Sequence, residues 1–174
     1  MQALQGKSIQ IRALEPEDLD FLYQVENDLN YWEVSSTQAP YSRFVLQQYL
    51  DNAHLDIYEA KQLRLMITEK KSGKSIGIID LFDYSPQHKR AGIGILIVTS
   101  KQGLGYASEA LKLLIDYSFG QLDLHQLFAN ITSDNEKSLK LFKKSGFKKV
   151  GVKKEWIYTN RQYKDEVLFQ LLNT

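Results

Sequence analysis

The sequence predicts an α/β protein with one mixed, mostly antiparallel sheet of about seven strands and about four flanking helices. Short segments with alternating apolar and polar residues recur along the chain, and each is typical of a strand. Longer segments repeat apolar residues every three or four positions, the spacing of a helix packed on one side. In residues 91–114 an apolar, β-branched run passes through a glycine-bearing turn directly into a helical repeat. This strand–turn–helix segment is the centre of the predicted fold.

The composition is that of a globular protein with a single domain over residues 1–174. Hydrophobic residues make up 43% and charged residues 25% of the chain, which is ordinary for such a domain. The absence of cysteine excludes disulfides, thiolate metal sites and a cysteine nucleophile. The first residues lack the apolar core of a secretory signal, and no apolar run approaches the roughly 18 residues of a membrane span. We therefore expect a cytoplasmic protein without a membrane partner.

The N-terminal third is predicted to contain one strand and two helices. Residues 8–13 alternate in polarity, and Pro16 with its acidic neighbours is typical of a first helical turn, which continues to about residue 28. Residues 30–41 are expected to form a loop. Ser42 is a preferred N-cap and precedes a second helix, whose apolar stripe is formed by Phe44, Val45, Tyr49 and Leu50.

The rest of the chain is predicted to supply six strands and two helices. The first three of these strands are consecutive and antiparallel, and the last two form a hairpin around Asn160 and Arg161. One helix continues to residue 119, and a capping box at residues 133–136 starts another that Gly146 ends. The strands are expected at residues 63–67, 76–81, 93–98, 125–132, 148–158 and 163–172.

The glycine-bearing turn at residues 102–107, Gln-Gly-Leu-Gly-Tyr-Ala, predicts an anion site. Glycine lets the backbone approach a ligand closely, and the free N–H groups of a helix N-terminus point at it, so a phosphate or pyrophosphate is expected. The spacing is not that of a Walker loop, since no Gly-Lys-Ser/Thr follows. It is not a dinucleotide fingerprint either, because Ser108 stands at the third glycine position.

Charge is distributed unevenly, although the net charge is only +1. Residues 15–33 hold seven acids and no base, whereas residues 137–154 hold eight lysines and no acid. Each stretch could simply be a solvated surface. Together they suit an enzyme with a cationic substrate and a polyanionic cofactor. A nucleic-acid partner is not expected, because the net charge is small and no recognition motif accompanies the lysines.

Two motifs resemble those of the GNAT N-acetyltransferases. Gln102, Gly105 and Ala107 meet the family's Gln/Arg-x-x-Gly-x-Gly/Ala signature, and residues 135–147 resemble its Asn-x-x-Ser/Ala…Gly-Phe segment. The predicted order of elements is also similar to that of the family. Residues 160–165 resemble the terminal hairpin of two branches, the spermidine/diamine acetyltransferases and the acetyltransferases of ribosomal-protein N-termini.

This resemblance implies a GNAT fold with a splayed central strand pair and direct acetyl transfer from acetyl-CoA to a primary amine in a ternary complex. The acceptor would be a polyamine-like small molecule or a protein N-terminus, and a homodimer is possible. In the family, the backbone of the central strand, the glycine turn and the second motif bind the cofactor. The corresponding residues here are Ile95, Leu96, Ile97, Gln102, Gly103, Leu104, Gly105, Tyr106, Ala107, Asn135, Ser138 and Phe142.

The sequence departs from the family pattern at two catalytic positions. Phe142 replaces the tyrosine that donates a proton in similar polyamine acetyltransferases, and Ser138 is the substitute we expect. Gly92 stands where many relatives have a glutamate, so the general base is open: Glu33, Asp83, Asp80, Glu155 or ordered water. The missing groups also leave an alternative, a non-catalytic acyl-CoA-binding or sensing protein on the same fold.

Aromatic residues could line an amine pocket by cation–π contact, or they could simply be packed in the core. The residues concerned are Tyr31, Trp32, Tyr41 and Tyr84. The three histidines lack metal-ligand spacing, so no metal site is expected.

Overall fold

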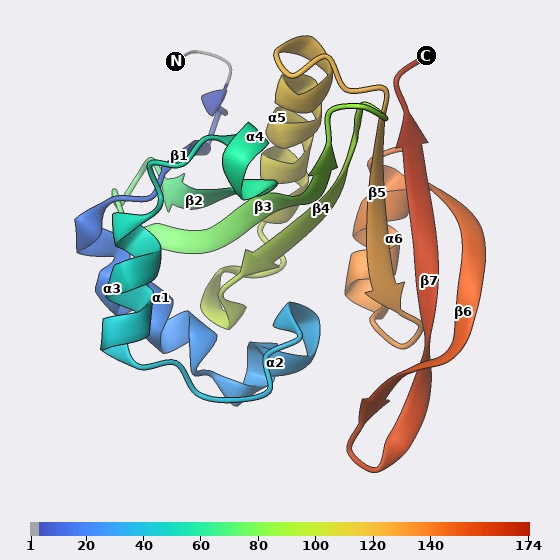
Figure 1. Ribbon diagram of the computed structural model, residues 1–174, viewed down its shortest axis with the longest axis horizontal. Helices are drawn as coiled ribbons and strands as arrows, with labels where there is room; N and C mark the ends of the chain where they lie inside the picture. Colours follow the sequence, from blue (N-terminus) through green and yellow to red (C-terminus); the bar gives the residue numbers. More distant parts are fainter. Residues whose placement is uncertain (1–3) are drawn as a thin grey trace.

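The computed structural model describes residues 4–174 and confirms the predicted α/β class (Figure 1). Its single sheet has seven strands in the order β1-β2-β3-β4-β5-β7-β6. The strands are β1 (Ile9–Ala13), β2 (Leu63–Glu69), β3 (Ser75–Ser85), β4 (Arg90–Ile97), β5 (Gln126–Thr132), β6 (Lys148–Thr159) and β7 (Gln162–Leu172). All neighbours are antiparallel except β4 and β5, which are parallel.

Six α-helices and two 3-10 turns (η) connect the strands within residues 4–174. They are η2 (Pro16–Asp18), α1 (Leu19–Glu26), α2 (Leu29–Ser35), α3 (Arg43–Asp51), α4 (Ile57–Ala60), η3 (Thr99–Lys101), α5 (Tyr106–Gly120) and α6 (Glu136–Lys144). No helix in this part of the chain is long and apolar enough to span a membrane.

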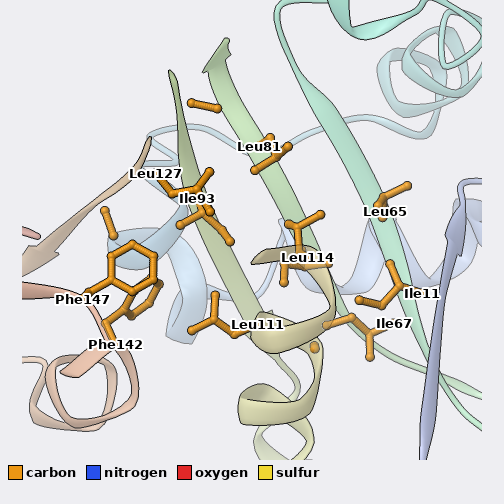
Figure 2. Close-up of a cluster of buried hydrophobic side chains, with 14 of the residues drawn as sticks. Ile11, Leu65, Ile67, Leu81, Ile93, Leu111, Leu114, Leu127, Phe142 and Phe147 are labelled. Atoms are coloured by element: carbon orange, nitrogen blue, oxygen red, sulfur yellow. The ribbon is translucent and has the colours of Figure 1, made fainter. Parts of the chain in front are cut away.

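Two apolar clusters lie on opposite faces of the sheet. On one face, Leu111 and Leu114 of α5 pack against strand residues that include Ile67 and Ile93 (Figure 2). On the other face, α1 and α3 cover Met66 and Ile78. Successive side chains of a strand point to opposite faces, which is why the neighbours Met66 and Ile67 belong to different clusters.

The N-terminal helices differ from the prediction. The segment expected to be a loop, residues 30–41, contains most of α2, which Asp28 caps by accepting a hydrogen bond from the Asn30 amide. A helix this short has too few turns to show a clear apolar repeat. In α3 the stripe is also different, since Leu46 is buried with Leu50 while Phe44 and Val45 are exposed.

The second half follows the prediction closely, with one correction at the start of α6. Asn135, not Ser133, is the N-cap, and its Oδ1 accepts a hydrogen bond of 3.2 Å from the Ser138 amide. Gly146 ends the helix with a φ of +95°. The hairpin turns at Asn160 and Arg161, both with positive φ, as a type I′ turn requires.

The central strands β4 and β5 pair at only three positions and then separate. The paired residues are Arg90 with Gln126, Ala91 with Leu127 and Gly92 with Phe128. Beyond Gly92, β4 continues along β3 while β5 continues along β7, so the sheet opens into a V between them (Figure 1). The predicted splay is therefore present and begins at Gly92.

A Phe–Gly–Phe row crosses three strands at the vertex of this V. Phe82 on β3 and Phe128 on β5 are both register partners of Gly92, and their rings meet edge to face with centroids 5.7 Å apart. A Cβ on Gly92 would overlap ring carbons of Phe82. The aromatic contact over the backbone therefore requires glycine here, which accounts for the missing glutamate.

We predict that Gly92→Ala destabilises the protein by about 1–3 kcal/mol, the usual cost of overpacking. Gly94→Ala is the matched control, because a Cβ there meets only ordinary contacts, at 3.4 Å from Asp80 Oδ1 and 3.8 Å from Phe82 Cε1. Urea unfolding of both variants measures the difference, and Phe82→Leu in the Gly92→Ala background should recover part of the loss. Equal unfolding free energies for the two glycine variants would contradict the packing argument.

Candidate functional site

The V between β4 and β5 holds two chambers that meet at its centre. The first, of about 610 Å³, lies toward α2, β3 and β5, and we call it the acidic chamber. The second, of about 730 Å³, lies toward the glycine turn, α5 and α6, and we call it the lysine chamber. Five of the lining residues are shared by the two chambers, and we call them the junction: Val34, Ile95, Leu96, Asn135 and Ser138.

The lysine chamber presents backbone amides to an anion. Gly103 and Gly105 have φ values of +75° and +86°, which fold the turn back so that α5 starts at the chamber wall. Side chains cap α2, α3, α4 and α6, whereas no side chain caps α5. The first-turn N–H groups of α5 are thus left to bind a ligand.

The side chains around these amides favour the same ligand. Lys101, Lys137 and Lys140 line the lysine chamber, and no carboxylate from residues 4–174 does. An uncapped helix N-terminus together with three ammonium groups suits a ligand with several negative charges, such as a diphosphate.

Gln102 braces the turn from within the protein. Its Nε2 donates to the Ile97 carbonyl at 2.9 Å, and its Oε1 accepts from Lys137 Nζ at 3.4 Å. The side chain therefore links the turn to the end of β4 and to α6. Most residues predicted to bind the cofactor line this chamber, with two exceptions: Leu104 is 62% exposed outside it, and Phe142 lines the acidic chamber.

The free edge of β4 offers amides at the junction. The Val98 amide donates to the Ile76 carbonyl of β3 at 2.9 Å. Since backbone direction alternates along a strand, the amides of Ile95 and Ile97 point the other way, toward the open V. Ile95 lies at the junction, so its N–H is positioned to stabilise a negatively charged oxygen.

The acidic chamber has the opposite charge. Four carboxylates line it: Glu26, Glu33, Asp80 and Glu166. Arg64 is the one basic residue among the described lining residues. Arg64 bridges Glu26 at 2.9 Å and Asp80 at 3.3 Å. Burial lowers the pKa of Arg64, but Asp80, Tyr49 and Glu26 more than compensate, so the pKa is raised and the guanidinium stays charged.

Glu33 is part of an ion-pair network that crosses the V. Lys164 on β7 donates from Nζ to Glu33 Oε1 at 2.8 Å and lies 2.7 Å from Asp134 Oδ2. These two carboxylates raise the pKa of Lys164, the hydrogen bond with Asp134 having the largest effect. The same contact lowers the pKa of Asp134. Lys164 thereby ties α2 to the loop that carries Asn135.

Ser138 and Phe142 have different surroundings. Ser138 is half-buried at the junction, and within residues 4–174 its hydroxyl makes no hydrogen bond. Phe142 is 3% exposed and packs edge to face on Phe147 with ring centroids 5.0 Å apart. Of the two, only Ser138 can donate a proton.

The four carboxylates considered as bases fall into two groups. Glu33 and Asp80 line the acidic chamber. Asp83 and Glu155 are exposed on strand irregularities with positive φ and lie outside both chambers. Of the four carboxylates, Glu33 and Asp80 thus remain as candidates for the general base.

The aromatic residues singled out from the sequence are not brought together. Tyr41 lines the acidic chamber and Tyr31 the lysine chamber, while Trp32 and Tyr84 line neither. Instead Tyr49, whose ring lies 5.6 Å from the Arg64 guanidinium, is an aromatic wall of the acidic chamber. Sequence analysis placed Tyr49 in the apolar stripe of a helix and did not single out Arg64. Only the facing register of Arg64 and Asp80 on adjacent strands could have indicated the ion pair between these two residues.

Comparisons with known proteins identify the architecture. Residues 8–148 match the family model described as the acetyltransferase (GNAT) domain. The chain is 31% identical over 163 residues to the spermidine N(1)-acetyltransferase of Escherichia coli K12, an alignment that covers 92% of this chain and 83% of that protein.

Solved structures of spermidine N-acetyltransferases are also similar to this chain in fold. The spermidine N-acetyltransferase of Vibrio cholerae in complex with CoA and spermine superposes with a TM-score of 0.84 at 28% identity, covering 95% of each chain. A dodecameric structure of spermidine N-acetyltransferase from the same organism superposes with a TM-score of 0.79 at 28% identity, covering 95% of this chain and 94% of that one.

These matches confirm the resemblance seen in the two sequence motifs, and with it the predicted fold. They also confirm acetyl-CoA as the cosubstrate, which the lysine chamber fits by its uncapped helix and its lysines. The relatives are named as N-acetyltransferases, so a non-catalytic CoA-binding protein is not favoured. By sequence and by fold, the chain belongs to the GNAT acetyltransferase family.

Proposed function

We propose that the acceptor of this acetyl-CoA-dependent N-acetyltransferase is a primary amine of a polyamine. One observation carries the proposal: two chambers of opposite charge meet at a junction that holds the Ser138 hydroxyl and the Ile95 amide. The lysine chamber suits the diphosphate of acetyl-CoA, and the acidic chamber suits a flexible cation. The names of the E. coli and V. cholerae relatives support the same acceptor.

The acceptor must lose a proton before it reacts. A primary alkyl amine with a pKa near ~10.4 costs about 4.6 kcal/mol to deprotonate at pH 7, whereas an α-amine near ~8 costs only about 1.4 kcal/mol. A base is therefore needed more for a polyamine than for a peptide N-terminus.

We assign the role of base to Glu33. It precedes the junction residue Val34, and its contact with Lys164 demonstrates that its carboxylate can accept a hydrogen bond from an ammonium group. Asp80 is held by Arg64 and by Gln62, whose Nε2 lies 3.3 Å from Oδ2. We propose that Asp80 binds the remaining positive charge of the acceptor.

Acetyl transfer then follows in one ternary complex. The neutral amine attacks the thioester carbonyl, the N–C bond forms, and the resulting oxyanion accepts a hydrogen bond from the Ile95 N–H. The C–S bond breaks, and the proton that the acceptor nitrogen gives up as the amide forms passes through the Ser138 hydroxyl to the leaving thiolate. The proton that the ammonium group loses before the attack passes to Glu33.

Three broader features belong to this proposal. We propose that residues 1–174 form one domain, which the continuous sheet supports. We propose that the enzyme acts in the cytoplasm, where acetyl-CoA is available. We also propose a homodimer, which three exposed aromatic side chains of β6 and β7 support: Trp156, Tyr158 and Tyr163. The dodecameric V. cholerae relative supports self-association in general.

The acceptor class is tested by measuring release of free CoA from acetyl-CoA with a panel of amines. We expect turnover with spermidine and spermine, because the acidic chamber favours several positive charges. Peptides with free Ala or Ser N-termini should react poorly. Turnover of the peptides alone would contradict the polyamine proposal.

Ser138→Ala should lower kcat about 100-fold while leaving the KM of acetyl-CoA nearly unchanged, because only the proton donor is lost. Ser133→Ala is the control, since Ser133 is exposed outside both chambers. Steady-state kinetics at saturating amine distinguishes the two. Wild-type kcat in Ser138→Ala would remove Ser138 from the mechanism.

Glu33→Gln should lower kcat/KM for the polyamine at pH 7 by about 100-fold. The deficit should shrink as the pH rises, since the free amine becomes abundant without a base. Asp80→Asn should instead raise the KM of the polyamine at every pH. Profiles of kcat/KM between pH 6 and pH 10 separate the roles, and exchanged profiles would make Asp80 the base.

A further inference from the structure

A buried carboxylate lies behind the glycine turn, outside the chemistry derived so far. Glu69 is the last residue of β2 and is 5% exposed. Its Oε1 accepts hydrogen bonds from Lys101 Nζ at 2.9 Å and from the Tyr106 hydroxyl at 2.5 Å. Its Oε2 accepts from the Ser72 hydroxyl at 2.5 Å.

Two of these donors mark the two ends of the glycine turn. Lys101 ends η3 and Tyr106 begins α5, so residues 102–105 are the whole segment between them. Both donors also line the lysine chamber, whereas Glu69 does not. A single carboxylate oxygen on β2 thus holds the start and the end of the segment that carries Gly103 and Gly105.

Such a restraint matters because glycine is the most flexible residue. A turn with two glycines loses much conformational entropy when it is ordered around a ligand. Contacts that order it beforehand reduce that cost at binding. The contacts of the Glu69 carboxylate with Lys101 and Tyr106 are made within the protein itself, so they can order the turn independently of the contacts that a ligand makes.

The charge of Glu69 opposes what an anion site would need. Hydrogen bonds from Ser72, then Tyr106 and Lys101, lower its pKa to about 2, so it is ionised at neutral pH. A negative charge behind a diphosphate site repels the diphosphate, and it also partly neutralises the positive charge of Lys101. Simple electrostatics therefore predicts tighter CoA binding without this carboxylate.

We propose that Glu69 is a positioning residue for acetyl-CoA: its carboxylate fixes both ends of the glycine turn so that the turn's amides face the diphosphate. The restraint acts on the diphosphate end of the cofactor. It therefore affects neither the amine nor the acetyl group at the junction. The inference rests on the family's use of acetyl-CoA and not on the identity of the acceptor.

The test is Glu69→Gln, for which the two physical effects have opposite signs. A neutral carboxamide oxygen is a weaker acceptor than a carboxylate oxygen and forms no ion pair with Lys101, so the turn loosens, and we expect the Kd of CoA by calorimetry to rise about tenfold. The KM of acetyl-CoA should rise with it, while kcat and the KM of the amine stay near wild type. An unchanged or lower Kd would overturn the proposal.

Glu109→Gln is the matched control for charge alone. Glu109 is in the first turn of α5 but lies outside the chambers, where its carboxylate accepts from the Ser8 amide at 2.8 Å. Removal of this charge should leave CoA binding unchanged or slightly tighter. A tenfold weaker Kd in this control would attribute the effect to general loosening of α5 and overturn the role of Glu69.

Two further measurements test the proposal if the Glu69→Gln variant folds poorly. Tyr106→Phe removes one of the two contacts and keeps the carboxylate, and it should weaken CoA binding by a smaller factor that is not additive with Glu69→Gln. With S-acetylpantetheine, which lacks the diphosphate, Tyr106→Phe and wild type should react equally. Equal losses with both acetyl donors would contradict a role at the diphosphate.

Discussion

Three residue pairs between β4 and β5 decide the shape of this protein. The two strands are the only parallel neighbours in the sheet that the structure describes, and their pairing stops at Gly92 and Phe128. At that point Phe82 and Phe128 close over Gly92 and hold the strands together at the vertex. Beyond the vertex, β4 keeps a free edge, and on this edge the Ile95 amide faces the open V. Both chambers depend on the same opening.

The opening also separates charge. Helices α1 and α2 and strands β3 and β7 bring carboxylates to the acidic chamber, while η3 and α6 bring lysines to the lysine chamber. A polyanion and a polycation can therefore approach from different sides and meet at the junction with their charges already matched. Lys164 and Gln102 connect the elements around this centre, the first through Glu33 and the second through Ile97.

The vertex explains how the chain departs from its relatives. An aromatic row over Gly92 leaves no room for the glutamate that many family members have at this position. Phe142 likewise packs on Phe147 instead of offering a hydroxyl. The groups that we propose for proton transfer are on other elements, with Ser138 on α6 and Glu33 on α2.

Local patterns in the sequence determined much of this structure. Alternating polarity predicted the strands, the two glycines predicted the anion-binding turn, and Asn160 with Arg161 predicted the hairpin. These features depend on a few neighbouring residues, so a short segment contains the information. Part of the lysine chamber was predictable for the same reason, because the glycine turn and the start of α5 are contiguous in sequence.

The acidic chamber was decided only by tertiary structure. Glu33 was one of four carboxylates considered as the base, and nothing local distinguishes it from Asp83; the register of β3 and the position of α2 make the difference. Asn135 caps α6 in place of Ser133, and Tyr49 meets Arg64 across two elements. The hydrogen bonds of Glu69 at the two ends of the glycine turn join β2 to residues more than thirty positions later. Contacts of this kind depend on how distant segments pack, and no local pattern of residues encodes that.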